Sequence, residues 1–165
     1  MPERWPWLGL ALVLVALDQA TKAWVVASLP EGGLRPVLPW FNLVLVYNTG
    51  AAFNFLDGAG GWQRWLFALV AMAVAGLLTV WLWRLPAGQW RLGAALGLIL
   101  GGALGNLVDR LTLGRVVDFI DWHYQAWHWP AFNLADAGIS LGVVLLFWDM
   151  LRPRGRQGGG GGDGR

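Results

Sequence analysis

The sequence predicts an α-helical integral membrane protein with four transmembrane helices and a small sheet on one face of the membrane. Three observations support this prediction. The chain of 165 residues is 56% hydrophobic and only 13% charged, about half the charged fraction of a soluble domain. Its apolar residues form four long blocks. The 13 tryptophans gather near the ends of these blocks, as the aromatic belts of membrane proteins do.

Each apolar block is long enough to cross a bilayer, whose hydrocarbon core of about 30 Å needs about 20 apolar residues in a helix. We expect spans at about 7–29, 62–83, 92–108 and 132–151. The first block is interrupted by Asp18 and Lys22. A cleaved signal sequence would not carry these charges in its apolar core, so this block is predicted to be a retained helix.

Basic residues indicate how the spans are oriented. Four spans put both termini on one side, and seven of the 12 Lys and Arg residues fall on that side: Arg4, Arg84, Arg91, Arg152, Arg154, Arg156 and Arg165. The positive-inside rule places this side, with both termini, in the cytosol. Most acids, Asp118 and Asp136 among them, then lie near the outer face.

The two outer loops contain segments of strand-like composition. These are "FNLVLVY" (41–47) and the start of "GRVVDFIDW" (114–122), both rich in β-branched residues. The two segments could pair in a small sheet. Such a sheet must lie at the outer surface or be covered by the helices, because lipid does not satisfy the hydrogen bonds of unpaired strand edges. The Gly-rich segment 152–165 has nothing to bury and is predicted to be a disordered cytosolic tail.

Charged residues inside the apolar frame need an explanation, because charge is costly in a membrane span. Asp18 and Lys22 are four residues apart and therefore stack on one helix face. We expect them to form a buried ion pair that fixes the first span against its neighbours.

A second polar group lies at the outer end of the third span. Asn106, Asp109 and Arg110 share one helix face, as residues three and four apart do. The glycines at 101, 102 and 105 allow another helix or a ligand to approach the backbone closely. Three polar types on one face favour a functional site over a simple interfacial anchor.

The residue inventory favours acid chemistry. The chain has no cysteine, no suitable Ser–Lys or Ser–His pair and no cluster of metal ligands, so we expect no metal or other cofactor. In aspartic proteases two carboxyl groups share one proton. The ionised group activates water, and the protonated group supplies a proton to the leaving amine. Asp118 and Asp136 could form such a pair, but spacing alone leaves Asp121 as an alternative to Asp118.

Several motifs resemble the lipoprotein signal peptidases, the type II signal peptidases of bacteria, which form an aspartic membrane protease family. They occur in the family's order and span about 7–151: "DQATK" (18–22), "NTGAAF" (48–53), "GGALGNLVDRL" (101–111), "GRVVDF" (114–119) and "PAFNLADAGIS" (130–140). The resemblance implies four transmembrane helices with a small periplasmic β-cradle and a periplasmic helical segment. Residues 1–151 would then form a membrane peptidase domain.

The resemblance also implies an activity, removal of the signal peptide from diacylglyceryl-modified prolipoproteins by cutting before the lipidated cysteine. It implies a catalytic dyad at Asp118 and Asp136. Four residues match positions that line the family's substrate pocket: Asn48, Asn106, Arg110 and Asn133. Three more match structural polar positions: Asp18, Lys22 and Asp109. We also hypothesise that Phe53 and Phe55 help to cover the site.

Other functions remain as alternatives. A different intramembrane aspartic protease would need a GxGD signature, and the predicted spans contain none. The acids and Lys22 could instead form a proton or ion path in a small transporter, or serve only to join helices in a structural subunit. Transporters usually show internal repeats, and none is visible here. We expect a monomer in the bacterial inner membrane, surrounded by lipid and with no nucleic-acid partner.

Overall fold

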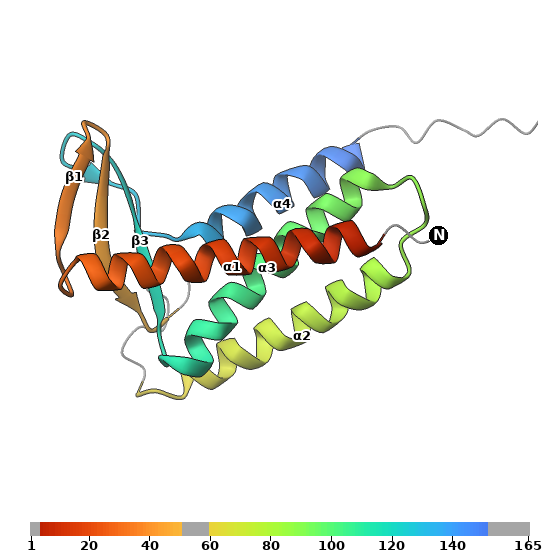
Figure 1. Cartoon of the computed structure of the whole chain (residues 1–165), viewed down its shortest axis with the longest axis horizontal. Helices are drawn as coiled ribbons and strands as arrows, with labels where there is room; N and C mark the ends of the chain where they lie inside the picture. The colour runs from red at the N-terminus through yellow and green to blue at the C-terminus, as the bar shows by residue number, and fades with distance from the viewer. Residues whose placement is uncertain (1–3, 51–59, 152–165) are drawn as a thin grey trace, which may run out of the picture.

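The computed structural model describes residues 4–50 and 60–151. In chain order the elements are α1 (Arg4–Ser28), β1 (Leu34–Leu38), β2 (Phe41–Asn48), α2 (Gln63–Trp83), α3 (Trp90–Thr112), β3 (Val116–Tyr124), β4 (Trp127–His128) and α4 (Leu134–Leu151). The four helices run side by side, with the sheet at one end of the bundle and the N-terminus at the other (Figure 1). Each helix is long and apolar enough to cross a membrane, so the four predicted spans are confirmed.

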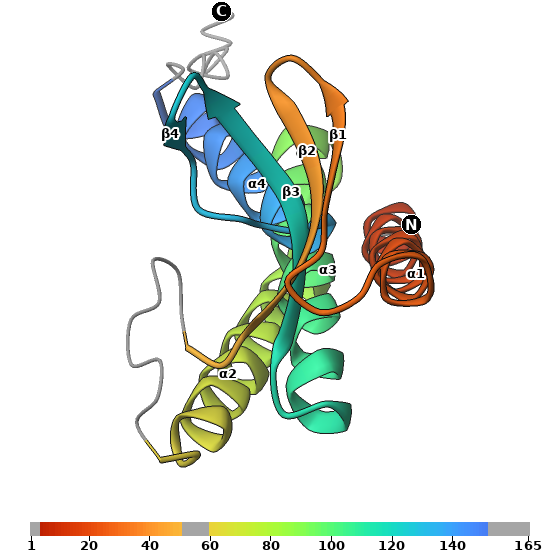
Figure 2. The same cartoon turned by 90° about the vertical axis from the view of Figure 1, so that its left-hand side faces the viewer.

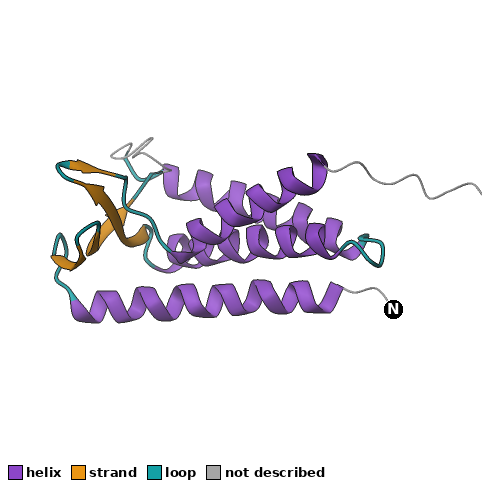
Figure 3. Ribbon diagram, turned by 90° about the horizontal axis from the view of Figure 1, so that it is seen from above, coloured by secondary structure: helices purple, strands orange, loops and turns teal. Residues whose placement is uncertain are grey.

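Helix α3 is the centre of the bundle. Of its apolar span 78% is buried inside the protein, compared with 28% or less for the other three helices. Figure 3 shows the helices lying along one another, with the strands gathered beyond one end. The other helices keep large apolar side chains on their outer faces, such as Leu12, Leu69 and Val144, which suits contact with lipid.

Glycines allow α3 to lie against the backbones of α1 and α4. A Cβ atom on Gly101 would lie 2.8 Å from the carbonyl oxygen of Ala11, and one on Gly105 would lie 2.7 Å from Asp18 Oδ2. On the other side, a Cβ atom on Gly102 would overlap the carbonyl oxygen of Ala135. These glycines were expected to allow close approach either of another helix or of a ligand, and the structure shows close approach of neighbouring helices.

The sheet is antiparallel in the order β1-β2-β3-β4 (Figure 2). Its central pair, β2 and β3, is the pairing predicted from composition, with Val46 opposite Asp118. The sequence did not indicate β1 or β4, because β1 contains a proline and is exposed throughout, and β4 has only two residues. A buried cluster joins the sheet to α1: Val25, Leu43, Leu45, Val117 and Phe119.

Some expectations fall outside the described residues. These are Phe53, Phe55 and the tail at 152–165. Within residues 4–50 and 60–151 the structure has no helix besides the four long ones, so the periplasmic helical segment implied by the resemblance is not found in that part of the chain.

Adding one methyl group to α3 should test the close packing. We expect Gly102→Ala to lower the free energy of unfolding by about 1–3 kcal/mol, because the new Cβ atom must displace the backbone of α4. Gly76→Ala is a matched control in α2, where a Cβ atom would meet nothing within 4 Å. It should be neutral or stabilise by up to about 1 kcal/mol. Thermal unfolding in detergent measures both variants, and equal effects would contradict the packing described here.

Candidate active site

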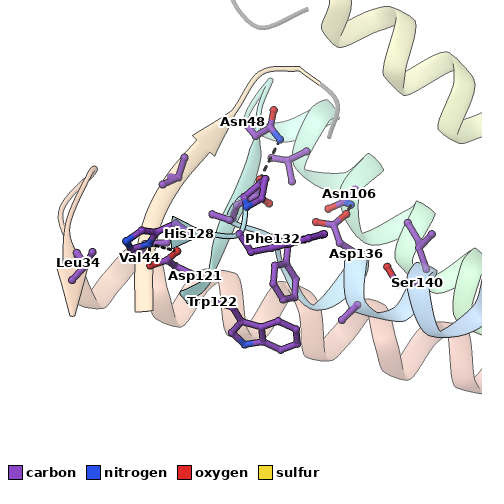
Figure 4. Close-up of a pocket in the computed structure, with 18 of the residues that line it drawn as sticks. Leu34, Val44, Asn48, Asn106, Asp121, Trp122, His128, Phe132, Asp136 and Ser140 are labelled. Atoms are coloured by element: carbon purple, nitrogen blue, oxygen red, sulfur yellow. Dashed lines mark hydrogen bonds and ion pairs between the residues drawn. The ribbon is translucent and has the colours of Figure 1, made fainter. Parts of the chain in front are cut away.

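Asp118 and Asp136 lie in one cavity where the helices meet the sheet. Asp118 is in β3, and Asp136 is in the first turn of α4. Both line a cavity of about 1180 Å³, together with Asn48, Asn106 and Arg110 (Figure 4). The structure therefore brings together two carboxyl groups that are 18 residues apart in the sequence.

Asn133 contacts both acids. Its side-chain Nδ2 donates to Asp118 Oδ1 at 2.7 Å. Its backbone N–H donates to Asp136 Oδ2 at 3.2 Å, and its Oδ1 accepts from the backbone N–H of Asp136 at 2.9 Å. This reciprocal pair is a capping box at the start of α4. Asn133 is completely buried and is not among the residues that line the cavity. This differs from the pocket-lining role that the resemblance implies for it.

The orientation of the Asn106 amide is fixed. Its Oδ1 accepts from Lys22 Nζ at 3.0 Å and from Asn133 Nδ2 at 3.1 Å. Because an ammonium group has only donors, the amide oxygen must face Lys22. The Nδ2 group is then directed at Asp136 Oδ1, to which it donates at 2.7 Å.

Lys22 is the centre of a buried ion network. Its Nζ atom lies 2.7 Å from Asp18 Oδ2 and 2.9 Å from Asp109 Oδ2, and all three side chains are at most 3% exposed. The ion pair predicted from the 18/22 spacing is present, and Asp109 joins it. A buried charge needs such partners, because its desolvation costs several kcal/mol.

The two acids of this network hold the backbone beside the two acids of the cavity. Asp109 Oδ2 accepts from the backbone N–H of Val117 at 3.0 Å, one residue before Asp118. Asp18 Oδ1 accepts from the backbone N–H of Ala135 at 2.9 Å, one residue before Asp136. The ion network therefore fixes the position of the backbone beside Asp118 and beside Asp136.

The environment of Asp118 makes its carboxyl group a weaker acid than that of an ordinary aspartate. Burial, followed by the negative charge of Asp136, raises the pKa of Asp118 to about 7, from about 3.9 for an unperturbed aspartate. Hydrogen bonds from Asn48 and Asn133 and the charge of Lys22 lower the pKa by less than burial and the charge of Asp136 together raise it. Two carboxyl groups that repel each other in this way titrate as a coupled pair.

Asn48 and Arg110 connect the cavity to the chain that follows β2. Asn48 Nδ2 donates to Asp118 Oδ2 at 3.2 Å, and its Oδ1 accepts from the backbone N–H of Gly50 at 2.9 Å. The Arg110 guanidinium donates to the carbonyl oxygen of Gly50 at 3.2 Å and lies 5.4 Å from the centre of the Phe67 ring. Both side chains line the cavity and are placed to meet a ligand there.

Asp121, the alternative to Asp118, also lines the cavity, but its carboxylate is engaged elsewhere. Its Oδ2 accepts from Asn42 Nδ2 at 2.8 Å, and its Oδ1 lies 2.9 Å from His128 Nδ1. Figure 4 shows Asp121 and His128 on the sheet side of the cavity and Asp136 on the helix side.

Sequence reasoning missed two residues of these networks. Gln19 donates to Asp109 Oδ1 at 2.8 Å and to the carbonyl oxygen of Gly105 at 3.1 Å. Its place between Asp18 and Lys22, as a polar residue inside an apolar span, could have revealed it. Asn42, which holds Asp121, gave no such signal, because an asparagine at the start of a strand is common near turns.

Comparison with known proteins agrees with this architecture. A family model described as signal peptidase (SPase) II matches residues 10–152. The lipoprotein signal peptidase of Ralstonia nicotianae is 54% identical over 147 residues, which cover 89% of this chain and 84% of that protein. The lipoprotein signal peptidase of Burkholderia mallei is 50% identical over 147 residues, covering 89% and 88%. A solved structure of a bacterial membrane enzyme superposes with a TM-score of 0.82 at 28% identity, over 93% of this chain and 92% of the other.

Four transmembrane helices with two carboxyl groups in one cavity define the class, an integral membrane protein equipped for acid–base chemistry. The matches then identify the family. The chain belongs to the signal peptidase II family, so it is a protease of lipoprotein processing and a multi-pass protein of the bacterial inner membrane. The transporter alternative is not favoured.

Removing the central charge of the ion network should have a large effect on stability. We expect Lys22→Met to lower the free energy of unfolding by about 3–5 kcal/mol, because two buried carboxylates lose their cation. Glu31→Gln is the control. It breaks the ion pair of Arg115 with Glu31, whose carboxylate is 64% exposed, and should cost less than about 1 kcal/mol. Chemical unfolding in mixed micelles measures both variants. A Lys22→Met protein as stable as wild type would show that the network does not hold the helices.

Proposed function

We propose that this chain cuts diacylglyceryl-modified prolipoproteins immediately before the lipidated cysteine, with Asp118 and Asp136 as the catalytic dyad. Family membership supplies the reaction class. The observation that carries the residue assignment is the shared cavity, in which Asp118 is buried, Asp136 is half-buried and both carboxyl groups bind Asn133.

The chemistry follows from a pair that holds one proton. The ionised carboxylate takes a proton from a water molecule while the oxygen of that water attacks the carbonyl carbon of the scissile bond. The protonated carboxyl group hydrogen-bonds the carbonyl oxygen, which becomes a hydroxyl of the tetrahedral intermediate. When the C–N bond breaks, the amine of the cysteine takes a proton from the dyad, and the signal peptide leaves with a new carboxyl group.

The four residues around the dyad divide into two roles in this proposal. Asn106 and Asn133 are positioning residues, because their amide groups are held by the acids and by each other. Asn48 and Arg110 line the cavity from β2 and from α3 and contact the substrate, and Asn106, which also lines the cavity, can reach the substrate beside Asp136. A signal peptide must unwind before its backbone can be cut, and polar side chains in the cavity can satisfy the backbone groups that unwinding exposes.

The proposed orientation puts the dyad near the outer face, with both termini in the cytosol. The described chain begins and ends at the end of the bundle opposite the sheet (Figure 1), and that end carries Arg4, Arg84 and Arg91. The positive-inside rule assigns it to the cytosol. We further propose that the chain acts as a monomer in lipid and without nucleic acid, because one chain supplies both acids and their supports.

Neutral substitutions of the acids test the assignment. We expect Asp118→Asn and Asp136→Asn each to lower turnover of a diacylglyceryl prolipoprotein by at least about 10³-fold, since an amide cannot exchange the proton that the dyad needs. Asn is also tolerated at the start of a helix, so Asp136→Asn should remain folded. The gel shift on loss of the signal peptide measures turnover by the purified chain in detergent.

Asp121→Asn is the matched control for these variants. It lines the same cavity but should still cut, because its carboxylate binds Asn42 and His128. An inactive Asp121→Asn together with an active Asp118→Asn would transfer the catalytic role to Asp121.

A further inference from the structure

The cavity extends well beyond the two acids. Its far part, here called the outer arm, is lined by Asp121, Trp122, His128 and Trp129. These residues belong to β3, to β4 and to the chain directly after β4. The outer arm therefore lies on the sheet, whereas the dyad lies where the sheet meets α3 and α4. The reaction proposed above needs none of these four side chains for its chemistry.

The polar floor of the outer arm is held in place by hydrogen bonds and a ring stack. Asp121 is 6% exposed and is held by Asn42 and by His128, whose Nδ1 lies 2.9 Å from Asp121 Oδ1. The His128 ring also stacks on the ring of His123, with centroids 5.1 Å apart. Because Nδ1 faces Asp121, Nε2 is the ring nitrogen that a ligand could use. His128 remains half-exposed.

Two tryptophans form the walls of the outer arm. Trp122 packs edge-on against Phe132 with ring centroids 5.1 Å apart, and the backbone N–H of Trp129 donates to the carbonyl oxygen of Trp122 at 2.8 Å. Both indoles are about half-exposed. Rigid aromatic walls with a polar hydrogen-bonding group between them suit an extended peptide, because indoles supply contact area at low entropic cost.

The course of the substrate chain through the cavity indicates which part of the substrate reaches the outer arm. This step rests on the proposed function. A signal peptide is an apolar helix, so it lies along the membrane spans, which run from the dyad away from the sheet (Figure 1). The chain after the scissile bond must leave the dyad on the other side, where the cavity continues over the sheet (Figure 4). We propose that the outer arm binds the first residues of the lipoprotein that follow the lipidated cysteine.

Two synthetic substrates and one pair of variants test this proposal. Both peptides carry the same signal sequence and the same diacylglyceryl cysteine. The short peptide ends at that cysteine, and the long peptide continues for roughly six residues, a length that an extended chain needs to occupy such a groove. For wild type we expect kcat/KM to be about tenfold higher for the long peptide, mainly through KM, because contacts remote from the reacting bond add binding energy.

Trp129→Ala and Trp127→Ala are a matched pair. The two indoles contact each other at 5.9 Å, but only Trp129 is among the residues that line the cavity of the dyad. Trp129→Ala should reduce the ratio of kcat/KM for the long peptide to kcat/KM for the short peptide to about two, because the loss of a central aromatic contact weakens binding at interfaces. Trp127→Ala should keep the ratio near ten. His128→Gln is a second variant in case Trp129→Ala does not fold, and it should reduce the ratio about threefold.

Each outcome decides the proposal. A ratio near one in wild type, or a ratio that neither Trp129→Ala nor His128→Gln changes, would overturn it. If the variants slow both peptides equally, the outer arm binds the lipid or the signal helix instead, and the proposal is again wrong. Failure of the proposed function would look different, because wild type would then cut neither peptide, or Asp118→Asn would cut both.

Discussion

The buried ammonium group of Lys22 is the interaction on which the rest of the site depends. It neutralises Asp18 and Asp109 at the point where α1 and α3 touch, and these two acids hold the backbone N–H groups directly before Asp136 and Asp118. Through Asn106 the same ammonium group also sets the direction of the amide that donates to Asp136. One positive charge thereby fixes four elements, α1, α3, β3 and α4, around the two carboxyl groups. A site built only on apolar packing would lack such directional control.

This design suits a protein whose solvent is lipid. Lipid tails are as apolar as leucine side chains, so helix association depends on close packing and on polar contacts between helices. Both are concentrated on α3, where glycines bring the backbones of α1 and α4 close and Asn106 and Asp109 supply the polar contacts. Asp136 shows how closely fold and chemistry are combined, since its carboxylate caps α4 while it lines the cavity. An acid at the edge of a span is costly, and here it is satisfied by Asn106 and Asn133.

The sequence predicted the four spans, the β2–β3 pairing and the Asp18–Lys22 pair, because each depends on local hydropathy or on fixed helical spacing. It could not predict that Asp109 would complete the ion network, since that depends on the depth at which α3 lies against α1. Strands β1 and β4 were missed because neither has a periodic hydrophobic pattern. Strand β1 contains a proline and is exposed throughout, and β4 has only two residues. Spacing left Asp121 as an alternative to Asp118, and the partners of Asp121, Asn42 and His128, emerge only once the sheet is formed. The motif also gave no sign that Asn133 would be completely buried.

The central claim is that Asp118 and Asp136 are held as one coupled acid pair. The most direct test is a ¹³C NMR titration of carboxyl-labelled aspartate in the detergent-solubilised chain, with Asp118→Asn used to assign the Asp118 signal. The account predicts a midpoint near pH 7 for Asp118 in wild type. It predicts a lower midpoint in Asp136→Asn, because replacing a carboxylate by a neutral amide removes the repulsion that raises the pKa of Asp118. The same midpoint in both proteins would contradict the account, since the two acids would then titrate independently.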